Sequence, residues 1–424
     1  MNESNIVFGL ERIKRVLSYF DNPQDKLKII HVAGTNAKGS ICFILGSMLK
    51  SFGYTVGIYS SPHINSINER FMIGNKLIND SDLDYYGMKV FLASRKLGVP
   101  LTYFEILTAV SFLYFLEKKT EYVLLETGLG GRLDATNVIK KPELVIIPTI
   151  ARDHLNYLGN SIKKIAIEKG AIIKSGSPVV IGSMPLSAGK IVNLRVRQKK
   201  TKLYSLGKEF GIKKAYAQIK ERSYKFNYCG IRQSTQDLVW MGINKAALKN
   251  VPISLASCEL LLGNEFNIEK ALKNKPDYLS GRTDVVNVSK NGKGYLSVFD
   301  GAHNTQAIMN LADSVSLFFK DYKKIFILNF MKDKEFKKNI NIILPFANEI
   351  LIKGINSPRA LRQEEVFEYI KRISPNFNAR IVDSAAEIFR SNKNNNVFIF
   401  CGSFYLIGEM IKELENEGWA ISRG

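Results

Sequence analysis

The chain has 424 residues, and its 46% hydrophobic and 23% charged residues are the balance of an ordinary globular protein. A chain of this length exceeds one hydrophobic core, so at least two domains are expected. No stretch has the length and apolarity of a membrane span, and residues 1–10 lack the features of a signal peptide. We therefore expect no membrane partner. The four cysteines form no CxxC pair, which argues against a zinc site and indicates reduced thiols, so we expect a cytoplasmic protein.

The formal net charge is +21, and much of it is concentrated in one segment. Residues 190–225 contain twelve Lys or Arg against two Glu, which amounts to +10. No nucleic-acid-binding signature accompanies this segment, so we interpret it as a solvated, irregular surface and expect no nucleic-acid partner. Attraction of polyanionic small molecules is an alternative role for the charge.

The first informative stretch in chain order is HVAGTNAKGS, residues 31–40. The short apolar run before it predicts a buried parallel strand, and the apolar spacing after it predicts a helix that begins near Lys38. A strand, a tight turn and a helix N-terminus form an anion-binding arrangement, although the glycine spacing departs from the strict P-loop pattern. An ordinary turn capped by Thr35 or Asn36 is the alternative interpretation.

Strands and helices continue to alternate through the first half of the chain. We predict strand 55–61, helix 104–118, strands 121–127 and 144–150, a helix over 162–174 capped by Ser161, and strand 178–183. Residues 184–240 have shorter and more polar patterns, which predict β-hairpins.

The last third restarts a clear alternation of strands and helices. The predicted strands are 295–300, 324–330, 349–355, 379–384 and 397–402, and the predicted helices are 308–319, 363–373 and 406–414. The glycines and charges of SGRTDVVNVSKNGKG predict a domain boundary near 284–294. We therefore predict an α/β protein with parallel sheets. The first and larger domain, which carries a β-rich insertion, would span 1–283, and the second would span 284–424.

Candidate site residues collect at the ends of the predicted strands. All four histidines, His31, His63, His154 and His303, fall at such ends. Ligands bind at that edge of α/β sheets, although ordinary loops also favour polar residues.

A carboxylate also stands at a predicted strand end. The segment ETGLGGRLDATN begins with Glu126, directly after a buried strand. A carboxylate there suits Mg²⁺, and an ion pair with Arg132 is the structural alternative. Asp153 beside His154, and Asp300 in FDGAHN, repeat the pattern on later strands.

Lys169 lies on the predicted helix 162–174, on the same face as Ile165 and Ala166, which should be buried. A buried ammonium is costly, so this lysine should have a lowered pKa or a partner. Glu168 or another carboxylate, or extension of the side chain to water, would satisfy it without any functional role.

Eight segments together carry a family resemblance: HVAGTNAKGS, SSPHINSINER, ETGLGGRLDATN, DHLNYLG, EKGAIIK, SGR, FDGAHN and GSFYLIGE. In order and approximate spacing they resemble folylpolyglutamate synthase and dihydrofolate synthase, which belong to the Mur ligase superfamily. The resemblance runs from residue 8 to the C-terminal helix, and LGGRLDATN is specific to the folate branch. It implies an N-terminal P-loop-type ATPase domain with the β-rich insertion and a C-terminal Rossmann-like domain that helps close over ATP and glutamate. It also implies an ATP-dependent amide ligase that adds L-glutamate to a folate or dihydropteroate carboxylate through an acyl phosphate.

The resemblance also implies site residues, which we carry over to this chain. ATP would be bound by Thr35, Asn36, Ala37, Lys38, Gly39, Ser40, Asn250, Arg282 and Asp300. Mg²⁺ would be held by Ser40, Ser61, Glu126, His154 and a carbamylated Lys169. The pterin or folate would contact Thr102, Tyr103, Phe104, Glu105, Leu133, Asp134 and Ala135, and the catalytic residues would be Lys38, His154, Lys169 and His303.

The chain departs from the family pattern at Ala37, where the family usually has glycine, and Asn250 is matched only through NVPISLASCELL. The expected small molecules are ATP as co-substrate, Mg²⁺ as cofactor, L-glutamate, and a folate or dihydropteroate, and a monomer is expected. Two alternatives remain: another amino-acid ligase of the Mur superfamily, or a P-loop kinase or NTPase. A kinase would need neither RLDATN nor a second domain.

Overall fold

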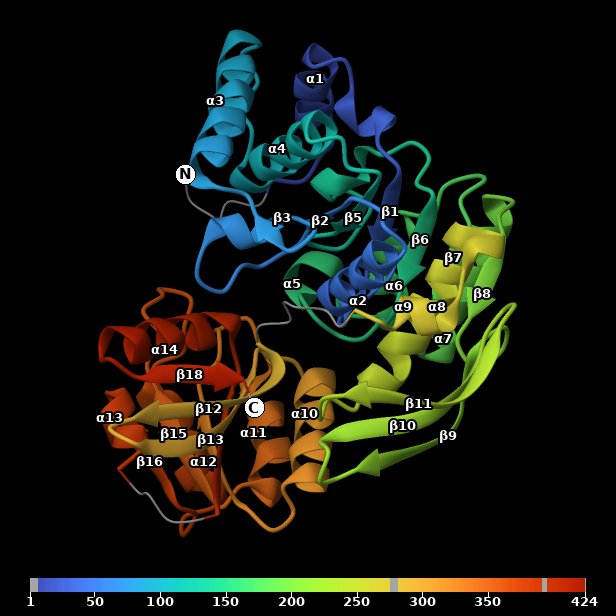
Figure 1. Cartoon of the computed structure of the whole chain (residues 1–424). Coiled ribbons are helices and arrows are strands. Elements are labelled where there is room, and N and C mark those ends of the chain that lie inside the picture. Colours follow the sequence, from blue (N-terminus) through green and yellow to red (C-terminus); the bar gives the residue numbers. More distant parts are fainter. Residues whose placement is uncertain (1–6, 275–280, 391–394, 424) are drawn as a thin grey trace. The chain divides into compact units, whose positions relative to one another are not determined.

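The computed structural model describes residues 7–274, 281–390 and 395–423, and the chain divides into two compact units. The first unit comprises Met1–Lys214, Asn227–Gln236 and Leu248–Tyr278, and the second comprises Ala215–Phe226, Asp237–Ala247 and Leu279–Gly424. Each unit contains a largely parallel sheet with helices (Figure 1), which confirms the predicted fold class. The domain division after residue 283 stays a prediction.

The sheet of the first unit has eight strands in the order β4-β3-β2-β5-β1-β6-β7-β8. The five pairs from β2 to β8 are parallel, whereas β3 and β4 are added antiparallel at one edge. The strands are β1 Ile29–Val32, β2 Val56–Tyr59, β3 Phe71–Ile73, β4 Lys76–Leu77, β5 Tyr122–Glu126, β6 Leu144–Ile147, β7 Val179–Ile181 and β8 Leu203–Ser205. The carboxyl ends of β5, β1 and β6 therefore lie side by side, with β1 in the middle.

Helices cover both faces of this sheet. They are α1 Glu11–Tyr19, α2 Lys38–Ser51, α3 Asp80–Lys96, α4 Tyr103–Glu117, α5 Leu155–Leu158, α6 Ile162–Gly170, α7 Leu186–Gln198, α8 Ala247–Leu262 and α9 Ile268–Ala271. Val123 and Leu125 of β5 share one core with α4, while Leu124 points to the other face, toward α2. A Cβ on Gly46 of α2 would lie 3.1 Å from Leu124 Cδ1, so glycine permits the close approach of this helix to the sheet.

Two predictions in the first unit are wrong in part. The basic segment 190–225 is ordered rather than irregular, because α7 and three strands run through it. Ala188, Val192 and Val196 are buried at four-residue spacing, a helical signal within the predicted hairpin region. The predicted helix 162–174 ends earlier, at Gly170, while its predicted cap is confirmed: Ser161 accepts a hydrogen bond from the Lys164 amide.

The prediction that His31 lies at the end of a strand is also wrong. His31 is the third residue of β1 rather than the end of the strand, and its side chain is fully buried. Its Nε2 lies 2.9 Å from the Thr136 hydroxyl, and burial, followed by the nearby Lys174, lowers its pKa to about 3. His31 is therefore a neutral core residue and not part of a site at the sheet edge.

The sheet of the second unit has seven strands in the order β16-β15-β14-β17-β13-β12-β18. The four neighbouring pairs from β16 to β13 in this order are parallel. Strands β12 and β18 are added antiparallel at one edge. The strands are β12 Arg282–Lys290, β13 Lys293–Asp300, β14 Lys323–Leu328, β15 Glu349–Lys353, β16 Ala379–Val382, β17 Asn396–Cys401 and β18 Ala420–Arg423. The helices are α10 Thr305–Phe318, α11 Phe336–Ile343, α12 Gln363–Ile373, α13 Ala385–Ile388 and α14 Phe404–Asn416.

The segment that led us to predict a domain boundary near 284–294 forms a β-hairpin. Residues 284–294 lie in β12 and β13, and the turn between these strands places Asn291 and Gly292 at φ 53° and 73°. Glycine and asparagine adopt this left-handed conformation readily, so they mark a turn here rather than a flexible connection. The predicted hairpins before residue 240 are confirmed by a three-stranded sheet, β9 Gly211–Gln218, β10 Ser223–Cys229 and β11 Ser234–Met241.

Within the described residues, no helix is long and apolar enough to cross a membrane.

Candidate active site

The loop between β1 and α2 is fastened to the segment that follows β6. The Thr35 amide donates to the Thr149 carbonyl at 2.9 Å, and the Asn36 amide donates to the Thr149 hydroxyl at 2.9 Å. The Thr35 hydroxyl accepts from the Ala151 amide and donates to the Ala151 carbonyl. These bonds use the Thr35 hydroxyl and hold the loop in one conformation, so this side chain does not cap α2.

The first turn of α2 has the features of an anion site. Its N-cap residue is Ala37, which provides no side-chain cap, and no acidic residue lies in the first turn. The first N–H groups of a helix have no acceptor within the helix, and they carry the positive end of its dipole. Lys38, Gly39 and Ser40 begin this helix, so the predicted phosphate loop has the required geometry.

Ala37 adopts the left-handed conformation, with φ 68° and ψ −1°. The alternative cap by Asn36 is also excluded, because the N-cap position belongs to Ala37. Glycine adopts this conformation at little cost, whereas alanine is strained there by roughly 1 kcal/mol. The departure from the family pattern is thus accommodated by backbone strain at the phosphate loop.

Glu126 meets Lys38 at the edge of the sheet. Its carboxylate is almost fully buried, its Oε1 lies 3.7 Å from Lys38 Nζ, and its Oε2 accepts from the Ser61 amide at 3.2 Å. Arg132 instead pairs with Glu168, at 2.9 Å, so the alternative partner for Glu126 is excluded. Three segments far apart in sequence thus bring a lysine, a carboxylate and Ser61 together.

Lys169 is buried, with 5% of its surface exposed, and its Nζ donates to the Gly34 carbonyl at 2.8 Å. Burial, with a further contribution from the charge on Lys38, lowers the pKa of this amine to about 7. The expectation of a lowered pKa is confirmed, and the alternative that Glu168 satisfies the amine is wrong, because Glu168 pairs with Arg132. A Cβ on Gly131 would lie 3.2 Å from Lys169 Cα, so the glycine loop packs directly on α6.

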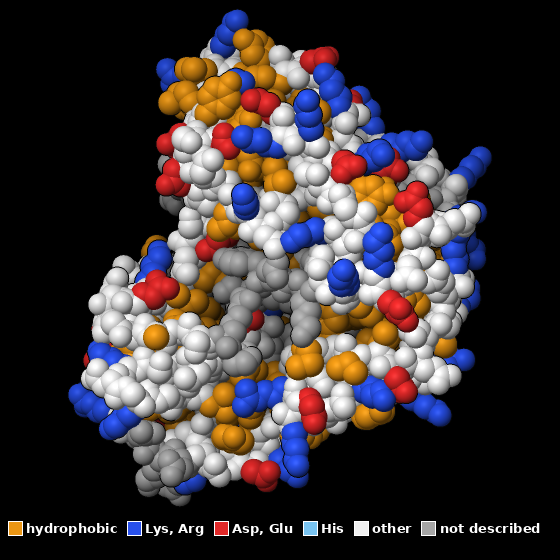
Figure 2. Space-filling model, viewed as in Figure 1, with side chains coloured by type: hydrophobic (Ala, Val, Ile, Leu, Met, Phe, Trp, Pro, Cys, Tyr) orange, Lys and Arg blue, Asp and Glu red, His pale blue; other side chains and the backbone are white. Residues whose placement is uncertain are grey.

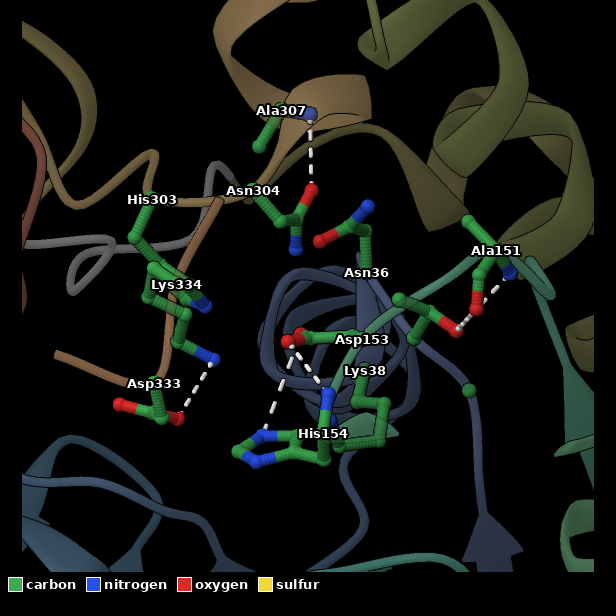
Figure 3. Close-up of polar contacts among 12 residues, drawn as sticks. Asn36, Lys38, Ala151, Asp153, His154, His303, Asn304, Ala307, Asp333 and Lys334 are labelled. Carbon is green, nitrogen blue, oxygen red and sulfur yellow. Dashed lines mark hydrogen bonds and ion pairs between the residues drawn. The ribbon is translucent and has the colours of Figure 1, made fainter. Parts of the chain in front are cut away.

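His154 and Asp153 follow β6 on the next strand end (Figure 3). The His154 amide donates to Asp153 Oδ1 at 2.9 Å, and its Nε2 lies 3.9 Å from Asp153 Oδ2. His154 has a positive φ of 49° and begins the short helix α5. His63, by contrast, accepts a hydrogen bond from Arg70 Nε at 2.9 Å.

Several residues predicted to contact the pterin have side chains engaged within the protein. Thr102 and Glu105 form a capping box at the start of α4, and Arg12 pairs with Glu105 at 3.1 Å. Asp134 accepts from the Leu129 amide at 2.8 Å and the Thr136 amide at 3.0 Å, and burial raises its pKa. These side chains shape the loops, and direct contact with a ligand stays a prediction for them.

The other predicted pterin residues are Tyr103, Phe104, Leu133 and Ala135. The Arg70 guanidinium lies over the Tyr103 ring, 5.7 Å from its centroid. Phe104 packs against the backbone of Gly128, where a Cβ would come within 2.5 Å of its ring. Leu133 and Ala135 flank Asp134 in the following loop, and Ala135 is buried.

In the second unit, polar residues follow β13. Asp300 accepts from the Thr283 hydroxyl and, at 2.8 Å, from the Ala302 amide, while removal from water raises its pKa to about 6. His303 Nδ1 donates to the Gly301 carbonyl at 2.8 Å, because a carbonyl oxygen can only accept, and this bond orients the ring. Arg282 is paired with Asp300 in the strand register and lies over the Phe404 ring.

Asp333 and Lys334 are site candidates that the sequence analysis missed. They follow β14, the strand beside β17, and lie 3.6 Å apart with the Lys334 side chain largely buried (Figure 3). Asn304 caps α10 by accepting from the Ala307 amide at 3.0 Å. The available signal was the polar run MKDK directly after the buried strand KIFILNF. Asn250, which the sequence matched only through NVPISLASCELL, is buried in α8.

Across the described ranges 7–274, 281–390 and 395–423, no three His, Cys, Asp or Glu side chains gather into a metal site. Mg²⁺ is usually held by one or two carboxylates together with substrate phosphates and waters. Glu126, beside an anion-binding helix N-terminus, fits that mode of binding.

Comparisons with known proteins agree with this geometry. The Mur ligase middle domain model matches residues 32–257, and the dihydrofolate synthetase C-terminal domain model matches residues 284–413. The dihydrofolate synthase/folylpolyglutamate synthase of Bacillus subtilis is 31% identical over 96% of this chain and 95% of its own length.

Similar solved structures are also folylpolyglutamate synthases. Folylpolyglutamate synthase from Thermotoga maritima is 29% identical, with a TM-score of 0.83 over 97% of this chain and 94% of that one. A bifunctional folylpolyglutamate synthase/dihydrofolate synthase with Mn, AMPPNP and L-glutamate bound is 25% identical, with a TM-score of 0.82 over 97% and 95% of the two chains. This chain therefore belongs to the dihydrofolate synthase/folylpolyglutamate synthase family of ATP-dependent Mur ligases.

Proposed function

We propose that this protein joins the amine of L-glutamate to a carboxylate of dihydropteroate or of a folate. A carboxylate oxygen of the acceptor attacks the γ-phosphorus of ATP, and ADP leaves. The glutamate nitrogen then attacks the acyl carbon, loses a proton and displaces phosphate. The observation that carries the proposal is the buried Glu126 beside Lys38 at the uncapped start of α2. The names of the Bacillus subtilis and Thermotoga maritima relatives support the two acceptor classes.

In the first unit, Thr35 to Ser40 would hold the phosphates of ATP, with backbone N–H groups and the Lys38 ammonium as donors. Glu126, Ser40, Ser61 and His154 would hold Mg²⁺. When bound, Mg²⁺ supplies charge neutralisation at the transferring phosphate. Most of the catalysis is then positioning, because Lys38 and the start of α2 fix the phosphate at the edge of the sheet.

Lys169 would carry a carbamate. Its lowered pKa leaves a substantial fraction of neutral amine at pH 7, and a neutral amine can add CO₂ with release of one proton. The product is an anionic oxygen ligand in place of a buried cation. The short distance from Lys169 to Gly34 would place this group beside the phosphate loop. Support comes from the unusual burial of the lysine.

Asn250 of α8, in the first unit, would contact the nucleotide. Arg282 and Asp300 of the second unit are also proposed to contact it. Lys334 would provide positive charge for the carboxylates of glutamate, with Asp333 orienting it at 3.6 Å. His303 would orient glutamate or a phosphate. The pterin would lie against Tyr103, Phe104, Leu133 and Ala135, on loops shaped by Thr102, Glu105 and Asp134. The cysteines of the chain are free thiols, in keeping with the expected cytoplasmic location.

The test is an assay of the purified protein with ATP, Mg²⁺ and L-glutamate, with dihydropteroate or tetrahydrofolate as acceptor in separate reactions. ADP and the glutamylated product are quantified together, the product by mass spectrometry. Equal amounts of ADP and glutamylated product are expected with at least one acceptor. ADP formation that is independent of glutamate would overturn the proposal and indicate a kinase or NTPase.

A further inference from the structure

Helix α3 presents an apolar face to the outside of the first unit. Its inner face is core: Tyr86, Val90 and Ala93 are buried against the neighbouring helices. Its outer face carries four large hydrophobic side chains at helical spacing, and these are exposed by 49% at Tyr85, 56% at Met88, 38% at Phe91 and 58% at Leu92. Figure 2 shows hydrophobic side chains gathered over α3 at the upper left. We call Tyr85, Met88, Phe91 and Leu92 the α3 face.

This patch is not ordinary surface. Single exposed hydrophobic residues are common, whereas contiguous patches of several hundred Å² mark interaction sites. Tyr19, 47% exposed, extends the α3 face beyond the end of the helix, because Lys96 Nζ donates to its hydroxyl at 3.3 Å. An exposed apolar stripe on a helix that is already anchored on its opposite side indicates a second packing partner.

The charges at the two ends of the stripe identify that partner. Asp84 stands at the N-terminal end and Arg95 at the C-terminal end, both exposed and on the same side as the α3 face. Neither has an ion-pair partner among the described residues. Their neighbours, by contrast, are paired within the chain, Asp82 with Lys118 at 2.9 Å and Lys89 with Glu117 at 3.8 Å.

We propose that the α3 face packs antiparallel against the α3 face of a second copy of this chain. A twofold axis places the start of one helix beside the end of the other, so Asp84 of each copy meets Arg95 of the other. The two positions are eleven residues apart, which is about 16 Å along a helix. Met88 and Phe91 then face each other across the axis, and Tyr85 and Leu92 close the seam. The pattern complements itself only in the antiparallel orientation.

The apolar area of the α3 face sets the expected strength of the dimer. The four side chains of the α3 face offer on the order of 400 Å² of apolar surface, judged from aromatic side chains of about 150–250 Å² each. A standard interface buries about 800 Å² per partner. The dimer is therefore weak, forming at micromolar or higher protein concentration. The expectation of a monomer drawn from the sequence describes the dilute protein.

A membrane surface is the other class of partner for an exposed apolar helix face. Binding to anionic lipid requires a basic polar border around the apolar stripe. The α3 stripe has basic residues, Arg95 and Lys96, at its C-terminal end. Its N-terminal end carries acidic residues instead, Asp80 and Asp84, both exposed. This charge pattern favours a second copy of the chain over a lipid surface.

The test is sedimentation velocity of the full chain from low to high micromolar concentration, with thermal melting as the fold control. The concentration of half-dimerisation is expected to rise at least tenfold in Leu92→Glu. Leu194→Glu, at an equally exposed leucine of α7, is the matched control and should not change it. Asp84→Arg and Arg95→Asp should each weaken the dimer, and the double variant should restore it, because the exchanged charges pair again across the axis.

The restoration in the double variant separates this geometry from any other contact. A chain that remains monomeric at every concentration overturns the proposal. So does a dimer that Leu92→Glu leaves intact, or one that both charge variants weaken without rescue in the double variant. Co-sedimentation with vesicles of phosphatidylcholine and phosphatidylserine, lost in Leu92→Glu while the free chain stays monomeric, would assign the α3 face to a membrane instead.

Discussion

Lys169 donates a hydrogen bond to the carbonyl oxygen of Gly34 at 2.8 Å, which ties helix α6 to the loop between β1 and α2, the predicted phosphate loop. The two residues are 135 positions apart in sequence. The bond connects a buried amine of lowered pKa to the loop that begins the anion-binding helix. A change in the charge of Lys169 should therefore change the electrostatic potential where the phosphates of ATP are expected to bind.

Replacement of Lys38 by alanine should reduce glutamate ligation by roughly 10²–10³-fold, the usual effect of removing one group that stabilises a transition state. The reason is the loss of positive charge beside Glu126 at the start of α2. Glutamate incorporation and melting temperature are measured on the same sample. Lys163→Ala, on the neighbouring helix α6, serves as the control, and full activity in a folded Lys38→Ala protein would exclude the phosphate-loop assignment.

Replacement of Glu126 by glutamine should raise the Mg²⁺ concentration needed for half-maximal activity, with little effect on pterin binding. The amide keeps the shape and the acceptor for the Ser61 amide but lacks the charge that the cation requires. The measurement is a Mg²⁺ titration of the rate, together with pterin binding by fluorescence. Glu168→Gln, which removes the Arg132 ion pair instead, is the matched control. An unchanged Mg²⁺ dependence in Glu126→Gln would contradict a metal-binding role.

Lys169 should make stability depend on pH in protein freed of CO₂. Its pKa is about 7 in the folded state and near its ordinary value of about 10.5 when unfolded. Between these values the unfolded chain binds the extra proton, so stability should rise with pH by up to about 1.4 kcal/mol per pH unit. Below pH 7 both states are protonated and this contribution is constant. Denaturant unfolding from pH 7 to 9.5 should show the slope in the wild type and lose it in Lys169→Met.

The proposed carbamate on Lys169 can be tested separately, through its carbon resonance. Incubation with ¹³C-bicarbonate should give a carbamate carbon resonance that is absent in Lys169→Ala and retained in Lys164→Ala. Added short-chain carboxylates should partly restore the activity of Lys169→Ala, since they would replace the anionic oxygen ligand. Absence of the resonance from active wild-type protein would remove the modification while leaving the buried, neutral amine in place.

Ala37→Gly should stabilise the protein by up to about 0.5 kcal/mol, because glycine relieves the strain of the left-handed conformation at φ 68°. The gain is smaller than the strain itself, since glycine also increases the entropy of the unfolded chain. Denaturant unfolding provides the measurement. Ala33→Gly, at a buried position in the same loop, should destabilise the protein, and a loss of stability in Ala37→Gly would show that the loop does not need glycine.

The sequence by itself determined the strand and the helix on either side of the predicted phosphate loop. The short apolar run before Gly34 and the apolar spacing after Lys38 are local patterns, and they correctly placed β1 and α2. Glu126 was likewise placed at the end of its strand. The apolar residues of α7 also recur at helical spacing, but the polar residues around them led us to predict hairpins there.

Only the tertiary structure decided which side chains meet. Glu126 pairs with Lys38 rather than Arg132 because β5 lies directly beside β1, an order that the chain sequence does not reveal. For the same reason Lys169 bonds to Gly34 rather than to its neighbour Glu168, and His31, between two flanking strands, is buried instead of exposed at a strand end. Periodicity along the chain sets which face of a strand or helix is apolar, whereas contacts between residues a hundred positions apart depend on how the strands are ordered in the sheet.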